Sequence, residues 1–309
     1  MTRTKLKNSV IDQVGNTPLM EIPHKKSDKV KLYAKLEWFN PSGSVKDRAA
    51  KAIFIDALKK DQLTNKILCD ATSGNTGISY AMLGAYFSIP VELALPRNAS
   101  EERKLLLRNY GAEVVLTDPL QGTDGAQRFV QHLIKKNPDK YFCPDQYNNE
   151  NNWKAHYETT GPEIWAQTDQ KVTHYIAGLG TTGTFVGTSR FLKEKGVTCV
   201  AVQPDNPMHG LEGWKHLETA IVPGIFDNTV ADENVEITTE EGFSFARAAT
   251  IHLGIHISPS SGANLAAAMK LVEQLDSGCV VTICPDNAMK YLNDPFWSDD
   301  DYLIKDPFV

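Results

Sequence analysis

The stretch "HYIAGLGTTGTFVGTSRFLKEKGVTCVAVQ", His174 to Gln203, contains a complete β-α-β pattern. It begins with an apolar β-rich run, turns through closely spaced glycines, continues with helical periodicity and ends in a second β-rich run. One helix between two strands is the connection that parallel strands need. The pattern therefore predicts a parallel sheet with a helix packed on its face.

The same β-then-α order recurs along most of the chain. From "VKLYAKL", residues 30–36, short β-rich runs alternate with helical patterns as far as the stretch above. A chain of 309 residues, 41% of them hydrophobic, is long enough for two domains of ordinary size. We therefore expect an α/β protein with two doubly wound domains, each built on a parallel sheet that helices cover on both faces.

A polar, asparagine-rich stretch interrupts this alternation at "PDQYNNENNWKAHYETTGPEIW", residues 144–165. Polar segments of this kind are common where a chain passes between domains. We place the crossing there and expect a smaller domain at 41–149 and a larger one made of 1–40 plus 150–309. The acidic, irregular tail "WSDDDYLIKDPFV", residues 297–309, is expected to be a solvated end.

Charge and cysteine content narrow the class of protein. The formal net charge is −6, and no block is dense in Lys and Arg, which argues against nucleic acid or an anionic membrane as the main partner. The N-terminus shows no apolar signal region and no apolar run approaches about 18 residues, so a cytoplasmic protein is expected. The five cysteines are scattered without a C-x-x-C pair, so we expect reduced, buried thiols and neither disulfides nor a metal site.

The glycine-rich turn "GLGTTGT", Gly178 to Thr184, follows an apolar strand and opens a helix. Backbone N–H groups and the positive end of the helix dipole at such a turn attract an anion, usually phosphate. The turn also matches G-x-G-x-x-G, and Asp205 lies where a dinucleotide-binding fold would hold ribose, so a dinucleotide site is an alternative. A tight turn without any ligand is another.

Two further turns precede predicted helices, "TSGNTG" at 72–77 and "SPSSGAN" at 258–264. The first is rich in hydroxyl, amide and backbone donors, which match a carboxylate or phosphate at a helix N-terminus. Taken alone, it is more simply explained as a capped helix start with Thr72 or Ser73 as the cap. The second alone indicates little beyond a helix start.

Lys46, read together with these turns, indicates what kind of site they could form. In "NPSGSVKDR", residues 40–48, it follows a Pro/Gly/Ser-rich turn and enters the first turn of a predicted helix. The helix dipole disfavours the ammonium form there and lowers the pKa of the lysine. A neutral lysine is a nucleophile for carbonyl groups, whereas most helix lysines are only solvated charges. A reactive lysine, a phosphate turn and a second anion-binding turn together describe a pyridoxal phosphate site for an amino acid.

In this order and spacing the motifs resemble those of the β-replacing pyridoxal phosphate enzymes, the family that includes cysteine synthase and cystathionine β-synthase. The resemblance covers nearly the whole chain and includes "VGNTPL", "NPSGSVKDR", "TSGNTG", "GLGTTGT", "SSGA" and "PDNAMKYL". It implies a fold like that of the tryptophan synthase β subunit and a homodimer. The phosphate turn "GTTGT" and Ala99 resemble the B-type cysteine synthases.

The resemblance also implies roles for individual residues. Lys46 would carry the cofactor as an internal aldimine, Asn75 would bond its ring hydroxyl, and Ser260 would face its pyridine nitrogen. The cofactor phosphate would be held in the larger domain by Gly180, Thr181, Thr182, Gly183 and Thr184. The substrate α-carboxylate would be held in the smaller domain by Thr72, Ser73, Gly74, Asn75 and Thr76, with Gln146 beside them. Lys215 either meets a phosphorylated leaving group or is an ordinary surface lysine.

The implied reaction is β-replacement on a β-substituted L-serine by a transferase or lyase. Lys46 would remove the α-proton, the β-substituent would leave, and a thiol or sulfide would add to the resulting aminoacrylate. L-Cysteine synthesis from O-acetylserine and sulfide fits best. Alternatives are cysteine synthesis from O-phosphoserine, cystathionine synthesis and sulfide release from cysteine. An NAD-binding protein and a catalytically silent scaffold are alternatives of other classes.

Overall fold

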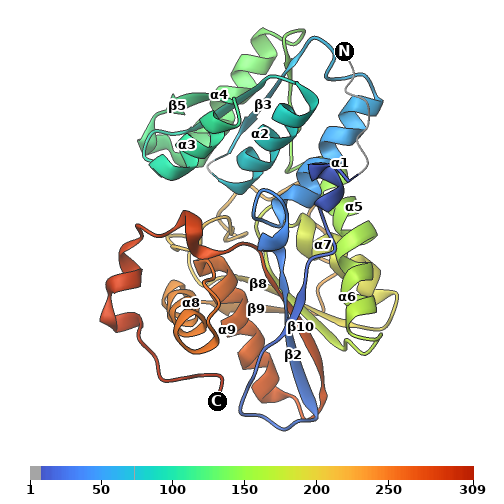
Figure 1. The fold of residues 1–309 in the computed structure, drawn as a ribbon, viewed down its shortest axis with the longest axis vertical. Helices are drawn as coiled ribbons and strands as arrows, with labels where there is room; N and C mark the ends of the chain where they lie inside the picture. Colours follow the sequence, from blue (N-terminus) through green and yellow to red (C-terminus); the bar gives the residue numbers. More distant parts are fainter. Residues whose placement is uncertain (1–7, 73) are drawn as a thin grey trace.

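The computed structural model describes residues 8–72 and 74–309, and it contains two sheets (Figure 1). The larger sheet has the strand order β1-β2-β10-β7-β8-β9. Its strands are β1 (Leu19–Glu21), β2 (Val30–Leu36), β7 (His174–Gly178), β8 (Thr198–Pro204), β9 (Glu233–Ile237) and β10 (Gly278–Cys284). Strand β1 runs antiparallel to β2, and the other neighbours in this sheet are parallel.

The smaller sheet has the order β5-β4-β3-β6, and its neighbours are all parallel. Its strands are β3 (Ile67–Ala71), β4 (Val91–Pro96), β5 (Glu113–Thr117) and β6 (Tyr141–Phe142). These strands come from the middle of the chain, between the segments that build the larger sheet. The domain boundaries predicted at residues 40 and 149 remain a prediction, since α1 packs both on α2 and on α5.

Helices cover both faces of each sheet (Figure 1). The α-helices of the described residues are α1 (Lys46–Lys59), α2 (Asn75–Phe87), α3 (Glu101–Asn109), α4 (Gly122–Lys136), α5 (Asn151–Ala155), α6 (Gly161–Gln167), α7 (Gly183–Lys193), α8 (Thr239–Leu253) and α9 (Pro259–Gln274). On the larger sheet, α8 and α9 pack on one face and α6 and α7 on the other. On the smaller sheet, α1, α2 and α3 lie opposite α4. The doubly wound α/β prediction is confirmed.

The side chains of β10 show why the larger sheet is covered twice. Val280 and Cys284 pack in the core beneath α8 and α9, whereas Val281 and Ile283 pack in the core beneath α6 and α7. Successive side chains of a strand point to opposite faces. An apolar run without polar alternation is therefore buried on both sides, as parallel strands usually are.

The C-terminal tail differs from the expectation of a solvated end. Phe308 is only 1% exposed and belongs to the core beneath α8 and α9. Its ring meets Phe245 of α8 edge-on at 6.1 Å, and Tyr302 meets Phe243 of the same helix at 5.2 Å. Burying one such aromatic side chain stabilises the fold by about 1.5–3 kcal/mol, so these rings hold the tail despite its acidic residues.

The cysteines and helices carry no sign of a crosslink or membrane span. All five cysteines are free. Four are buried, but Cys143 is only half-buried because it follows β6 at the edge of its sheet. No described helix is long and apolar enough to cross a membrane. Within residues 8–72 and 74–309, no group of three His, Cys, Asp or Glu side chains is placed to hold a metal ion.

Candidate active site

A cavity lies where the carboxyl ends of β3, β7 and β10 meet, the usual ligand position in parallel sheets. It brings together most of the predicted site residues from distant parts of the sequence. The predicted residues in its wall are Lys46, Thr72, Gly74, Asn75, Thr76, Gln146, Gly180, Thr181, Thr182, Thr184 and Ser260. Gly183, the first residue of α7, is absent from the wall, and a side chain there would clash with Asn152. Ser73 lies outside the described residues.

Helix α1 begins at Lys46, where the sequence predicted a helix start. The side chain is half-buried and forms part of the cavity wall. The pKa of Lys46 is lowered mainly by burial, and the Asp286 carboxylate opposes part of this lowering. The predicted lowering of the pKa is thus present, but its cause is burial, whereas the sequence pattern had pointed to the helix dipole. An amine that loses its proton more readily than an exposed lysine suits a nucleophile or a base.

The turn between β7 and α7 forms a cup of backbone and hydroxyl groups. Thr182 has a left-handed backbone, with φ of 69°, which residues other than glycine rarely adopt. Its buried Oγ1 has no hydrogen-bond partner among the described residues. A side chain at Gly180 would clash with the carbonyl of Gly213. An unpartnered hydroxyl, a close-packed glycine and a helix N-terminus together fit a phosphate group.

Thr184 of this cup is held by His156, which comes from the π-helical segment His156–Thr160 between α5 and α6. His156 Nε2 lies 3.2 Å from Thr184 Oγ1, and His156 Nδ1 lies 2.9 Å from Thr160 Oγ1. Burial, with a smaller effect of the Arg48 charge, lowers the pKa of His156 to about 3, so the ring is neutral. A neutral imidazole donates through one nitrogen and accepts through the other, so it can orient both threonines.

The loop after β3 leads into α2, whose N-cap residue is Gly74, and no side chain among the described residues caps this helix. Thr72 Oγ1 accepts from the Gly74 N–H at 3.4 Å, so Thr72 lies before the N-cap and does not itself cap α2. Ser73, the other cap candidate, lies outside the described residues. Nearby, Thr76 Oγ1 donates to Gln146 Oε1 at 2.9 Å, and both residues are buried. The open helix start and these polar side chains make a second place that suits an anion.

Asp286 and Tyr291 also line the cavity, although no role for either residue was predicted. They belong to the "PDNAMKYL" motif after β10. Asp286 Oδ2 accepts from Asn75 Nδ2 at 2.7 Å and from the Tyr291 hydroxyl at 2.9 Å. Asp286 is 1% exposed, and its Oδ1 has no hydrogen-bond partner in the described part of the chain. The motif itself was visible in the sequence, but its contact with Asn75, 211 residues away, was not.

Ser260 is the second residue of α9 and is 5% exposed. Its hydroxyl lies 3.1 Å from that of Ser258, which caps the helix by accepting from the Ser261 N–H. Pro259 occupies the first helical position, where a missing N–H costs little. The local sequence thus starts a helix and places the Ser260 side chain in the cavity wall.

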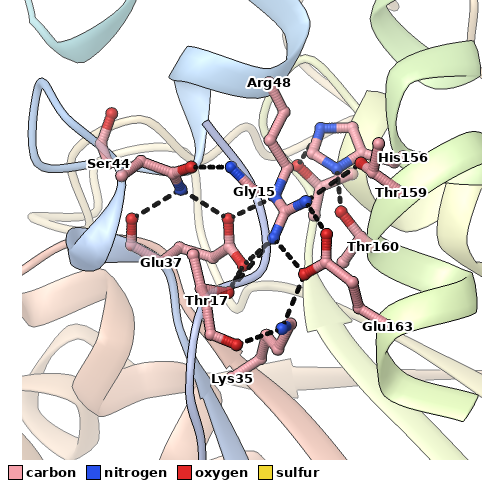
Figure 2. A network of polar contacts seen from close by, with 12 residues as sticks. Gly15, Thr17, Lys35, Glu37, Ser44, Arg48, His156, Thr159, Thr160 and Glu163 are labelled. Atoms are coloured by element: carbon pink, nitrogen blue, oxygen red, sulfur yellow. Dashed lines mark hydrogen bonds and ion pairs between the residues drawn. The ribbon is translucent and has the colours of Figure 1, made fainter. Parts of the chain in front are cut away.

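A buried ion network follows Lys46 along α1 (Figure 2). Arg48 bonds Glu37 through Nε at 2.7 Å and Glu163 through Nη1 at 2.7 Å, while Lys35 Nζ lies 2.8 Å from Glu163. Burial alone would raise the pKa of Glu163, but the two cations outweigh it and lower that pKa to about 2. The network joins β2, α1 and α6 close to the start of α1.

Three other charged residues complete the surroundings. Glu212 lines the cavity and forms an ion pair with Arg103 of α3. Lys215 is not part of the wall, and its Nζ lies over the Tyr147 ring, 5.1 Å from the centroid. Asp205 is exposed just after β8 and is not in the wall either. The dinucleotide alternative thereby loses its ribose ligand.

Comparison with known proteins gives a consistent match. The family model described as "Pyridoxal-phosphate dependent enzyme" matches residues 10–286. A cysteine synthase of Aquifex aeolicus is 47% identical over 308 residues, covering 96% of this chain and 94% of its own. Cysteine synthase B of Escherichia coli is 38% identical and covers 92% and 95%. The crystal structure of a cysteine synthase from Entamoeba histolytica has a TM-score of 0.90 at 33% identity, covering 97% and 93%.

Proposed function

We propose that this chain, which belongs to the pyridoxal-phosphate dependent enzyme family, makes L-cysteine from O-acetylserine and sulfide. The observation that carries the proposal is the position of Lys46. The pKa of its amine is lowered by burial. The same cavity contains the cup at the start of α7, which suits a phosphate group, and the uncapped start of α2. The names of the relatives, cysteine synthase and cysteine synthase B, support the choice of reaction.

Bound pyridoxal phosphate supplies an electron sink for the bond that breaks at the substrate α-carbon. The residues of the cup, Gly180 to Thr184, would hold its phosphate at the N-terminus of α7. Ser260 would place a hydroxyl against the ring nitrogen. A hydroxyl, unlike a carboxylate, does not keep that nitrogen protonated, which favours loss of a β-substituent over transamination.

The chain's own residues would then bind the substrate and move its α-proton. Residues 72–76, with Gln146, would hold the α-carboxylate at the start of α2. Lys46 would take the α-proton as a base and return it after the nucleophile has added. Burial lowers the pKa of Lys46, and the Asp286 carboxylate opposes part of this lowering. A lowered pKa favours the neutral amine, which is the form that acts as a base.

The choice of substrate is tested by kcat/KM for O-acetylserine, O-phosphoserine, serine and cysteine, with sulfide and with homocysteine as acceptors. We expect O-acetylserine with sulfide to exceed every other pair by at least about tenfold. The highest value for serine with homocysteine would identify a cystathionine synthase instead. Faster release of sulfide from cysteine would identify a lyase, and either result contradicts the proposed reaction.

We further propose a cytoplasmic homodimer with two domains per chain. Residues 41–149 would carry Lys46 and the carboxylate loop, and residues 1–40 plus 150–309 would carry the cup. The free cysteines support a reducing compartment. Light scattering on the purified chain with bound cofactor should give the mass of two chains, and a monomer at every concentration would contradict the dimer.

A further inference from the structure

Asn75, the first residue of α2, has a side-chain amide that is held at both ends. Its Oδ1 accepts from Lys290 Nζ at 2.6 Å, and its Nδ2 donates to Asp286 Oδ2 at 2.7 Å. Lys290 also donates to the Gly43 carbonyl at 3.2 Å. These partners lie more than two hundred residues away in the chain, and they are brought to α2 by the segment after β10.

The chemistry of the two partners permits only one orientation of this amide. Lys290 gives hydrogen atoms both to Gly43 and to Asn75, so the Asn75 atom facing it must be the oxygen. Asp286 Oδ2 already accepts from the Tyr291 hydroxyl, so the Asn75 atom facing it must be the nitrogen. Flipping the amide would set donor against donor and acceptor against acceptor.

This orientation leaves one hydrogen of Nδ2 for the cavity. The amide nitrogen carries two hydrogens, and Asp286 takes one of them. Asn75 lines the cavity, and no second acceptor for Nδ2 occurs among the described residues. A ligand acceptor placed there would meet a donor whose direction is already fixed.

We infer that Lys290 is a positioning residue, which locks the Asn75 amide so that its free N–H points at the ring oxygen of bound pyridoxal phosphate. The inference rests on the proposed function. A donor at that oxygen stabilises its anionic form, which absorbs in the visible range, over the form with a proton on the oxygen, which absorbs in the near ultraviolet. Without Lys290 the amide can turn its carbonyl toward the ring and remove that preference.

The test is the absorption spectrum and the cofactor dissociation constant of Lys290→Met, measured on the protein saturated with pyridoxal phosphate. We expect the ratio of visible to near-ultraviolet absorption to fall about tenfold, and cofactor binding to weaken by about tenfold. Lys290→Arg should restore most of the absorption ratio and most of the cofactor affinity, because a guanidinium also donates hydrogen bonds and accepts none. Lys305→Met, which removes an exposed lysine from the tail, should match the parent protein.

A second variant approaches the same amide from its other end. Asp286→Asn offers either a donor or an acceptor to Asn75, so the amide loses its fixed direction and the spectrum should move the same way by a smaller factor. Circular dichroism will show whether Lys290→Met folds. If it does not, the spectrum of Asp286→Asn tests whether the direction of the Asn75 amide controls the visible absorption.

The outcomes separate this inference from the proposed function. A parent protein that binds no pyridoxal phosphate and shows no visible band contradicts the proposed function. A parent protein with a visible band, together with Lys290→Met and Asp286→Asn proteins of unchanged spectrum and cofactor affinity, overturns the role of Lys290 alone.

Discussion

His156 is a buried imidazole that stays neutral in the folded protein. Its pKa is about 3, against an ordinary value of 6.5, and burial is the largest cause. Below the ordinary value the unfolded chain binds a proton at this residue and the folded chain does not. His156 therefore lowers the stability of the fold as the pH falls from about 6.5 toward about 3, and it has no such effect above that window.

The variant His156→Asn should remove this pH dependence. Between about pH 7 and about pH 5, the free energy of unfolding of the parent protein should fall by about 2 kcal/mol more than that of the variant. Urea unfolding at the two pH values measures the difference. His132→Asn, at an exposed position of α4, should keep the parent's full decrease. Equal decreases in the parent and in His156→Asn would show that His156 does not titrate as described.

The role of a single residue was predictable where its chemistry depends on its neighbours in the sequence. Lys46 stood out because a rigid turn and a helix start surround it in the sequence. Its burial and the nearby Asp286 depend on the segment after β10, which no local pattern reveals. Lys290 gave no signal by itself, since its contact with Asn75 exists only in the folded chain.

Among the elements, the ion network links α1 to β2 and α6 through buried side chains (Figure 2). The side chains of Lys35 and Arg48 are at most 1% exposed, so each depends on its carboxylate partners. Removing one member of a buried network leaves an uncompensated charge without water around it.

Glu163→Gln should therefore lower the free energy of unfolding by about 3–5 kcal/mol, because Arg48 and Lys35 both lose a charged partner. Denaturant unfolding at neutral pH measures it. Glu150→Gln breaks an exposed pair with Lys154 and should change the value by less than about 1 kcal/mol. If the two substitutions lower the free energy of unfolding by similar amounts, the buried network does not stabilise the fold more than an exposed ion pair does.

Most strands and helices were predictable because their signals are local. Apolar runs and helical periodicity place β7, α7 and β8 where the structure has them. The cap of α2 was not predictable in the same way, since Thr72 is a good capping residue and yet the structure places Gly74 at that position. Which of several suitable residues caps a helix depends on where the preceding strand ends.

At the scale of the molecule, the sequence predicted two doubly wound sheets but not how the ends of the chain complete them. The tail carries enough acid to look solvated, and only the presence of Phe243 and Phe245 on α8 explains why Tyr302 and Phe308 pack. The cavity likewise depends on contacts between segments that are distant in the sequence. Its wall combines the start of α1, the open helix starts and the segment after β10, which only the complete fold brings together.

Lys46 is proposed to perform β-replacement with pyridoxal phosphate in this cavity. The rate of L-cysteine formation from O-acetylserine and sulfide, measured on the cofactor-saturated parent protein and on Lys46→Ala, tests this role. The parent should be active and the variant slower by roughly 10³-fold, since a positioned acid–base group typically contributes 10²–10⁴-fold. A variant within tenfold of an active parent, or a parent that forms no cysteine, would be incompatible with this role of Lys46.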